Sequence, residues 1–214
     1  QDRTKSDSVT ILRSNNRHGG AEFTYSVWLF LRPPNASNDP NEQGKLRNVF
    51  VKGAHSYDSA TGVSIVNGPG MYLKERTLEA ATEYDLHVVM DHIGDGDGKD
   101  EVVVDSLPIG KWFHVAVRLQ NMMLDVYVNG TIAKRQNLEF APKQNFYDVV
   151  VNGNNGFSGQ LSNLRYYNRA LNIFEMNNIV MWGPNTNKSS LSTDSRAKTG
   201  NYSYLSSLWY SSKY

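Results

Sequence analysis

The chain of 214 residues contains no cysteine and no long hydrophobic run. Without cysteine it has no disulfide and no thiolate ligand for zinc, and a chain of this length can be stabilised by its core alone. No stretch approaches the roughly 18 apolar residues of a membrane-spanning helix. Because the first residue is Gln1, we expect an upstream segment, and any membrane attachment would have to come from an anchor there.

An excess of charge of one sign is also missing. The 22 Lys and Arg residues balance 21 Asp and Glu residues, which leaves a net charge of +1, and the basic residues do not cluster. A nucleic-acid-binding protein needs a basic patch, so we expect no nucleic-acid partner. The five histidines show no metal-ligand spacing, and the G-x-S-x-G motif of serine hydrolases is absent.

Short segments rich in aromatic and β-branched residues dominate the chain and predict strands. We expect strands at 23–31, 48–52, 62–65, 70–73, 84–91, 101–104, 112–119, 124–128, 131–134, 146–151 and 159–167, with turns at 67–69 and at Asn129-Gly130. One short helix is predicted from Asn172 to Gly183, because Asn172 and Glu175 have the spacing of a capping box and Ile173, Met176, Ile179 and Val180 form an apolar stripe. The fold class is therefore all-β: a two-sheet antiparallel jelly-roll sandwich with one short C-terminal helix.

Three regions are expected along the chain. Residues 1–7 form an N-terminal extension, residues 8–183 the jelly roll, and residues 184–214 a polar tail with an aromatic end. A tail this poor in aliphatic residues has to dock on something to become ordered. We expect it to dock on its own sandwich or on another protein subunit, through Tyr202, Tyr204, Leu208, Trp209, Tyr210 and Tyr214.

Two stretches carry a family pattern. Residues 110–117 (GKWFHVAV) with 124–130 (LDVYVNG) resemble the G-x-W-x-H-V-A-V … Y-V-N-G strand pair of laminin G-like domains, and residues 157–171 resemble their closing strand and helix start. The resemblance implies the concanavalin A-like lectin/glucanase jelly roll. Residues 68–73, 142–145 and 182–185, with Trp209-Tyr210, are similar to versions encoded by large DNA viruses of algae and amoebae, which implies a virion-associated protein.

Catalysis of the glucanase type would need three acidic residues on one face of a strand. Glu83 and Asp85 have the alternate spacing, but His87 or Val88 stands where the third carboxylate would be. Retaining hydrolysis needs a protonated acid as well as a nucleophile. We therefore expect no catalytic residues, and we interpret this segment as the polar face of an amphipathic strand.

The acidic segment at residues 91–101 and four glycosylation motifs are the remaining candidate sites. Asp95, Asp97 and Asp100 could ligate calcium, the one cofactor considered, but Asp-Gly repeats also form ordinary hairpin turns, which is the favoured interpretation. The N-x-S/T pattern occurs at Asn35, Asn129, Asn187 and Asn201. Asn129 is more simply explained as a turn residue.

Together these features predict a non-enzymatic interaction module. The leading hypothesis is a structural or surface component of a large virus particle, of minor capsid type, that makes protein–protein contacts and is located in the virion or at an extracellular surface. The alternative is a lectin domain that binds glycans, with or without calcium. The third hypothesis is a degenerate hydrolase of the β-glucanase type.

Overall fold

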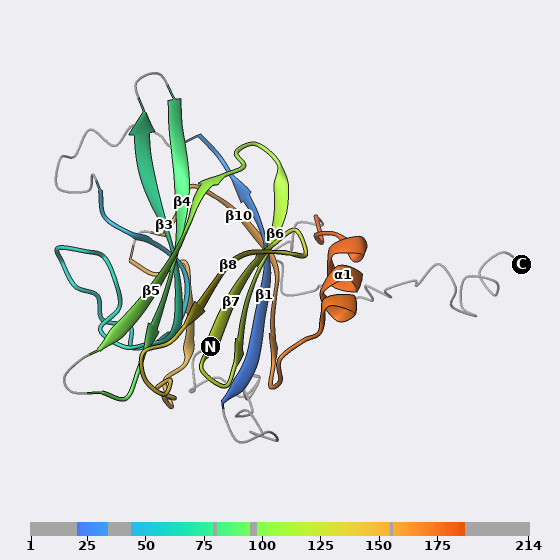
Figure 1. The fold of residues 1–214 in the computed structure, drawn as a ribbon. Coiled ribbons are helices and arrows are strands. Elements are labelled where there is room, and N and C mark those ends of the chain that lie inside the picture. Colours follow the sequence, from blue (N-terminus) through green and yellow to red (C-terminus); the bar gives the residue numbers. More distant parts are fainter. Residues whose placement is uncertain (1–20, 34–43, 79–80, 95–97, 155, 187–214) are drawn as a thin grey trace, which may run out of the picture.

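The computed structural model describes residues 21–33, 44–78, 81–94, 98–154 and 156–186. Within these ranges the chain forms ten strands and one helix, arranged as a two-layer sandwich (Figure 1). The elements are β1 (Glu22–Leu31), β2 (Arg47–Gly53), β3 (Asn67–Leu78), β4 (Ala81–Asp91), β5 (Lys99–Leu107), β6 (Trp112–Gln120), β7 (Met123–Val128), β8 (Thr131–Asn137), β9 (Val149–Val151), β10 (Gly159–Tyr167) and α1 (Ile173–Trp182).

The strands form two antiparallel sheets of five strands each. The first sheet has the order β10-β1-β6-β7-β8, and the second has the order β5-β4-β3-β2-β9. Alternate residues of most strands point into the space between the sheets, as the period-2 pattern requires, whereas β8 has no buried residue. On β4 these are Tyr84, Leu86 and Val88, which are fully buried in the core as predicted. The predicted fold class is confirmed.

The segment from Gly62 to Leu73 differs from the prediction. The predicted strand at 62–65 is wrong, because these residues belong to a loop, and the predicted turn at 67–69 is the start of β3. Ser64 explains the first difference: its backbone N–H donates to the Tyr72 hydroxyl at 3.0 Å and its hydroxyl donates to the carbonyl of Ala54 at 2.7 Å. The second follows from Asn67, whose N–H donates to Asp91 on β4 at 2.8 Å.

The predicted strand at 146–151 is shortened to Val149–Val151. The ammonium group of Lys52 on β2 donates to the carbonyl oxygens of Asn145 and Tyr147, so a side chain takes up backbone groups that a strand would pair. Phe146 and Tyr147 are exposed. The segment therefore forms a surface loop before β9.

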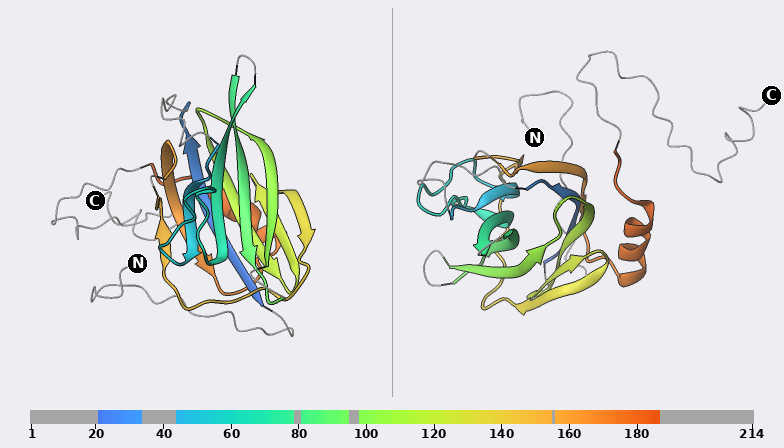
Figure 2. Two further views of the ribbon diagram at one scale, coloured as in Figure 1. Left: turned by 90° about the vertical axis from the view of Figure 1, so that its left-hand side faces the viewer. Right: turned by 90° about the horizontal axis from the view of Figure 1, so that it is seen from above.

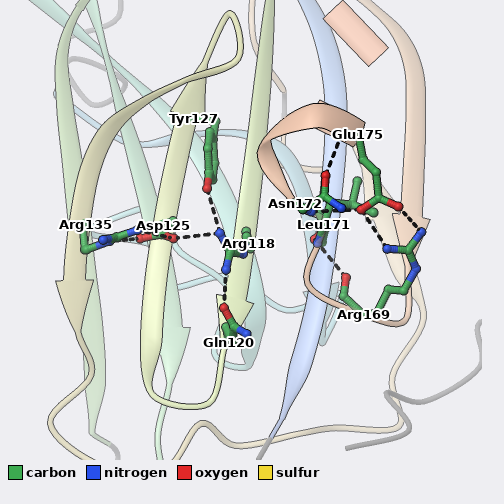
Figure 3. Close-up of polar contacts among 10 residues, drawn as sticks. Arg118, Gln120, Asp125, Tyr127, Arg135, Arg169, Leu171, Asn172 and Glu175 are labelled. Atoms are coloured by element: carbon green, nitrogen blue, oxygen red, sulfur yellow. Dashed lines mark hydrogen bonds and ion pairs between the residues drawn. The ribbon is translucent and has the colours of Figure 1, made fainter. Parts of the chain in front are cut away.

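Helix α1 lies against the outer face of the first sheet (Figure 3). The predicted capping box is present: Asn172 accepts from the N–H of Glu175, and the Glu175 carboxylate accepts from the N–H of Asn172, both at 2.9 Å. Arg169 forms an ion pair with Glu175 just before the helix. Of the predicted apolar stripe only Met176 is fully buried, in a cluster that includes Leu171, Ala116 and Tyr127. Ile173 is exposed, because it stands at the first turn, beyond this cluster.

A buried acid stabilises the outer face of the same sheet. Asp125 on β7 is 1% exposed and accepts two hydrogen bonds from Arg135 on β8, at 2.6 and 3.1 Å. Arg118 on β6 lies 3.6 Å away and also donates to the Tyr127 hydroxyl (Figure 3). A buried carboxylate is tolerated because both arginines neutralise it.

Several predicted features lie outside the described residues. These are the N-terminal extension 1–7, most of the tail, and with it Tyr202, Tyr204, Leu208, Trp209, Tyr210 and Tyr214. Among the described residues, no helix has the length and apolar character needed to cross a membrane.

Candidate functional site

Of the predicted calcium ligands, Asp95 and Asp97 lie outside the described residues and Asp100 lies on β5. Asp100 is buried, and its Oδ1 accepts a hydrogen bond from Gln136 on β8 at 3.4 Å. In the described part of the chain, no group of three or more His, Cys, Asp and Glu residues could hold a metal ion. The calcium site stays a prediction, to which the structure contributes one buried carboxylate.

Asn129 is the one glycosylation candidate that lies within the described ranges; Asn35, Asn187 and Asn201 lie outside them. Asn129 adopts a positive φ of 49° at the β7–β8 turn, and its side-chain oxygen accepts from the N–H of His114 at 2.9 Å. The Asn129-Gly130 turn is thus present as predicted. Modification of Asn129 remains a prediction.

The outer face of the second sheet carries a set of charged side chains, which we call the polar face. Alternation along β4 directs Glu83, Asp85 and His87 to this side, opposite to the core residues of the same strand. Neighbouring strands add Arg76 from β3 and Glu101 and Ser106 from β5.

The polar face is internally paired. Glu83 accepts from Ser106 Oγ at 2.7 Å and from Arg76 at 3.1 Å, and these two contacts, the serine first, hold the pKa of Glu83 below its usual value. Asp85 lies 3.3 Å from the same Arg76. A carboxylate in this environment stays ionised at neutral pH. Glu83 can accept hydrogen bonds but does not hold a proton to donate.

Sequence reasoning missed one acid on this face. Glu101 lies across from β4, and its Oε1 is 2.6 Å from Nδ1 of His87. The sequence contains part of the information needed to predict this contact, because the β4–β5 hairpin places alternate residues of both strands on the same side of the sheet. The register that brings Glu101 beside His87 could not be read from the sequence.

A second candidate surface lies where the loop 54–66 meets the loop before and after β9. We call it the aromatic rim and define it as His55, Tyr57, Phe146, Tyr147 and Asn154. Phe146 is 72% exposed and Tyr147 is 52% exposed, and the rings of His55 and Tyr57 are 5.8 Å apart in an edge-on arrangement. Figure 2 shows the loop 54–66 on the side of the sandwich away from α1.

Hydrogen bonds to β2 hold the segments on either side of β9 in place. The N–H of Gly53 donates to the carbonyl of Asp148 at 3.2 Å, and the N–H of Gly153 donates to the buried Asn48 side chain at 3.1 Å. Gly153 is in tight contact with Tyr57, since a Cβ built there would lie 2.1 Å from the tyrosine hydroxyl oxygen. The exposed aromatic rings therefore stand on an ordered support.

This arrangement suits binding more than bond breaking. Exposed aromatic rings offer flat apolar surfaces, and the imidazole of His55 offers a donor and an acceptor. No motif in the sequence marks this surface. Its one signal is the aromatic pair Phe146-Tyr147 after a polar segment, and the sequence predicts this pair to be part of a strand.

Comparison with known proteins places the chain in a family. A laminin G family model described as "Concanavalin A-like lectin/glucanases superfamily" matches residues 3–175. The chain belongs to this superfamily. The predicted laminin G-like resemblance is thereby confirmed, whereas the narrower similarity to viral domains stays a prediction. A search of curated protein sequences finds no match to the chain.

Solved structures of similar fold include binding domains of bacterial toxins. The binding domain of Paraclostridial Mosquitocidal Protein 1 superimposes with a TM-score of 0.53 and 17% identity, covering 75% of this chain and 37% of the other. The receptor binding domain of botulinum neurotoxin C/D mosaic serotype superimposes with a TM-score of 0.51 and 11% identity, and the match covers 76% of this chain and 36% of the other. The botulinum neurotoxin serotype G binding domain superimposes with a TM-score of 0.51 and 9% identity, and the match covers 76% of this chain and 36% of the other. At this identity the superposition shows the fold, and this chain spans little more than a third of those structures.

Proposed function

We propose that this concanavalin A-like domain is a non-enzymatic module that binds a glycan or a glycan-bearing receptor at the aromatic rim. The observation that carries the proposal is the exposure of Phe146 and Tyr147 on a loop whose backbone is hydrogen-bonded to Lys52 and Gly53 of β2. Family membership supports it, because the superfamily includes lectins by its description. The solved structures named above are binding domains of the same fold.

The chemistry of sugars fits such a surface. A pyranose ring presents an apolar C–H face that packs against an aromatic ring, while its hydroxyl edge needs donors and acceptors. Phe146 and Tyr147 would supply the first contact, and His55, on the loop that follows Gly53, the second. A small, exposed surface of this kind supports a Kd of roughly 1 mM, about −4 kcal/mol, for one monosaccharide, and higher affinity requires several sugars or several copies.

The absence of catalysis is part of the proposal. Glycoside hydrolysis needs a carboxylic acid that is protonated at working pH, and the lowered pKa of Glu83 opposes this role. Asp85 is held by Arg76 and by the N–H of Ser106 at 3.0 Å. We expect no hydrolysis of a β-glucan by the intact chain. Detection of hydrolysis that a Glu83→Gln substitution removes would contradict this part of the proposal.

A glycan array with the intact chain tests the proposal. We expect binding to a defined set of glycans and at least a ten-fold loss in a Phe146→Ala, Tyr147→Ala double variant. The matched control is Phe174→Ala, which removes an equally exposed aromatic ring from α1, on the far side of the sandwich. A blank array, or equal loss in both variants, would overturn it. Repeating the array with a chelator tests the calcium prediction separately.

The second candidate function is a structural or surface component of a large virus particle. It is favoured by the similarity of residues 68–73, 142–145 and 182–185 to viral domains and by the exposed apolar side chains of α1. Under this proposal the domain is located in the virion or at a cell surface and contacts other subunits. Labelled antibodies against the domain should then decorate intact particles, and particles free of the protein would contradict it.

A further inference from the structure

Helix α1 carries large apolar side chains on two opposite sides. One face carries Met176, which is fully buried against the first sheet. The opposite face carries Phe174, Met181 and Trp182, which are 76%, 83% and 77% exposed. Positions 174, 181 and 182 are seven and eight residues apart, or about two helical turns, so these side chains lie on one side of the helix. In Figure 2, seen from above, that helix forms the outermost layer of the described structure.

A surface helix normally turns its apolar side chains to the core and its polar ones to solvent, whereas the outward side of α1 carries these three large apolar residues beside the exposed Asn177 and Asn178. Three large apolar side chains on an outward helix face are more than the single scattered residues that an ordinary surface carries. Among the described residues no element packs against this side of α1. Phe174, Met181 and Trp182 therefore form a docking surface that needs an occupant.

We propose that the occupant is the chain's own segment 202–214, and the proposal is independent of glycan binding. This segment contains one charged residue, Lys213, and its apolar and aromatic residues are Tyr202, Tyr204, Leu205, Leu208, Trp209, Tyr210 and Tyr214. Its chemistry thus matches the face of α1, where the exposed residues are apolar or uncharged. A strongly charged segment would not be suited to this surface.

The described part of the chain ends close to α1. After α1 the backbone turns back along β10, where the hydroxyl of Ser162 donates to the carbonyl of Asn185 at 2.8 Å. Residues 187–201 then provide a polar linker that reaches up to about 50 Å when extended, whereas α1 is about 15 Å long. The linker is therefore long enough for residues 202–214 to lie along the whole helix.

Tethering also favours this occupant over a free partner. A segment joined to its site by a short flexible linker has an effective concentration in the millimolar range. A second copy of the chain at micromolar concentration would have to compete against it. The docked segment would cover the helix, and displacing it would expose an apolar surface for another subunit.

Because the chain contains no cysteine, a disulfide cross-linking test has no competing thiols. The variant Met181→Cys, Leu208→Cys contains only the two introduced thiols, and oxidation at low protein concentration is followed on a non-reducing gel. The matched control is Ile65→Cys, Leu208→Cys, because Ile65 is exposed on the loop 54–66 and shares the same tail thiol. We expect an intramolecular disulfide at least ten-fold faster in the first variant. Equal rates would overturn the proposal, and so would disulfide-linked dimers as the main product, since they would assign the face to a second copy.

Hydrogen exchange provides a readout without substitutions. Amides of α1 in the intact chain are compared with those in a chain truncated after residue 201. We expect exchange about five- to ten-fold faster in α1 after truncation, with no change in β6, which serves as the internal control for folding. Unchanged exchange in α1 would overturn the proposal.

Discussion

The buried imidazole of His114 predicts a measurable loss of stability in mild acid. His114 on β6 is fully buried, its Nε2 lies 2.8 Å from the hydroxyl of Ser26, and its ring stands edge-on to Trp28 with centroids 5.4 Å apart. No described group lies within hydrogen-bonding distance of its Nδ1. Burial lowers the pKa of His114 from 6.5 to about 4, because the imidazolium form would lose hydration.

The sign and size of the effect follow from proton linkage. In the unfolded chain His114 takes up a proton near pH 6.5, whereas in the folded chain it stays neutral until about pH 4. Between these values the unfolded state binds more protons, so the free energy of unfolding falls as the pH falls. Each pH unit in this range lowers the free energy of unfolding by up to about 1.36 kcal/mol. Between pH 6.5 and about pH 4 the free energy of unfolding therefore falls by roughly 3 kcal/mol.

Urea denaturation at several pH values between 7 and 4 checks this prediction. Other titrating groups also contribute, so the intact chain is compared with a His114→Gln variant that cannot be protonated. We expect the variant to be less stable at pH 7 but to lose about 3 kcal/mol less on acidification. Parallel pH profiles would refute the reasoning, as would an NMR titration of the His114 ring with a midpoint above pH 6.

Two further predictions concern the outer face of the first sheet. Asp125→Ala removes the carboxylate that neutralises Arg118 and Arg135, and we expect a loss of roughly 1–3 kcal/mol in chemical denaturation, because the mostly buried Arg118 loses its partner whereas the half-exposed Arg135 stays hydrated. Glu175 has its pKa lowered to about 2 by Arg169 first and by the N–H of Asn172 second, so its contribution is present above about pH 4.5 and is lost as the pH falls toward 2. Since both side chains are partly exposed, Glu175→Gln should cost only about 1 kcal/mol at pH 7, and the variant's melting temperature should change less between pH 5 and 2.

Features set by local sequence were the ones that could be predicted. The Asn129-Gly130 turn needs positive φ at both residues, and the structure shows 49° and 82°. The capping box of Asn172 and Glu175 depends on two residues three positions apart. Strand β4 follows from its alternation, which separates core residues from the polar face. In each case the determining contacts lie within a few residues of the chain.

The candidate surfaces could not be predicted, because distant segments build them. Arg76 and Glu101 reach β4 from β3 and β5, and their places depend on strand register. The aromatic rim depends on Lys52, whose ammonium group donates to the carbonyl oxygens of residues 145 and 147. Because of these hydrogen bonds the hydrophobic segment at Phe146 forms a loop and not a strand. Helical periodicity marked the apolar stripe of α1 but did not indicate that its opposite face would also be apolar and exposed.

The support beneath the aromatic rim can be tested by a substitution that touches no exposed ring. In Gly153→Ala the new Cβ would lie 2.1 Å from the Tyr57 hydroxyl oxygen, so one of the two loops has to move. Overpacking of this kind costs roughly 1–3 kcal/mol, and we expect weaker glycan binding along with lower stability. The Tyr57 hydroxyl is buried and has no hydrogen-bond partner among the described residues, so Tyr57→Phe alone should cost little.

The double variant Gly153→Ala, Tyr57→Phe tests whether the loss of stability in Gly153→Ala comes from a steric clash with the Tyr57 hydroxyl. Removing the hydroxyl takes away the closest contact of the added methyl group and leaves those at 3.0 Å and beyond, so we expect the double variant to be more stable than the sum of the single effects by about 0.5–2 kcal/mol. Binding should recover in parallel, because the loops can return to their positions. Additive effects would mean that Gly153 and Tyr57 do not meet, and the aromatic rim would then lack the rigid support on which the binding proposal depends.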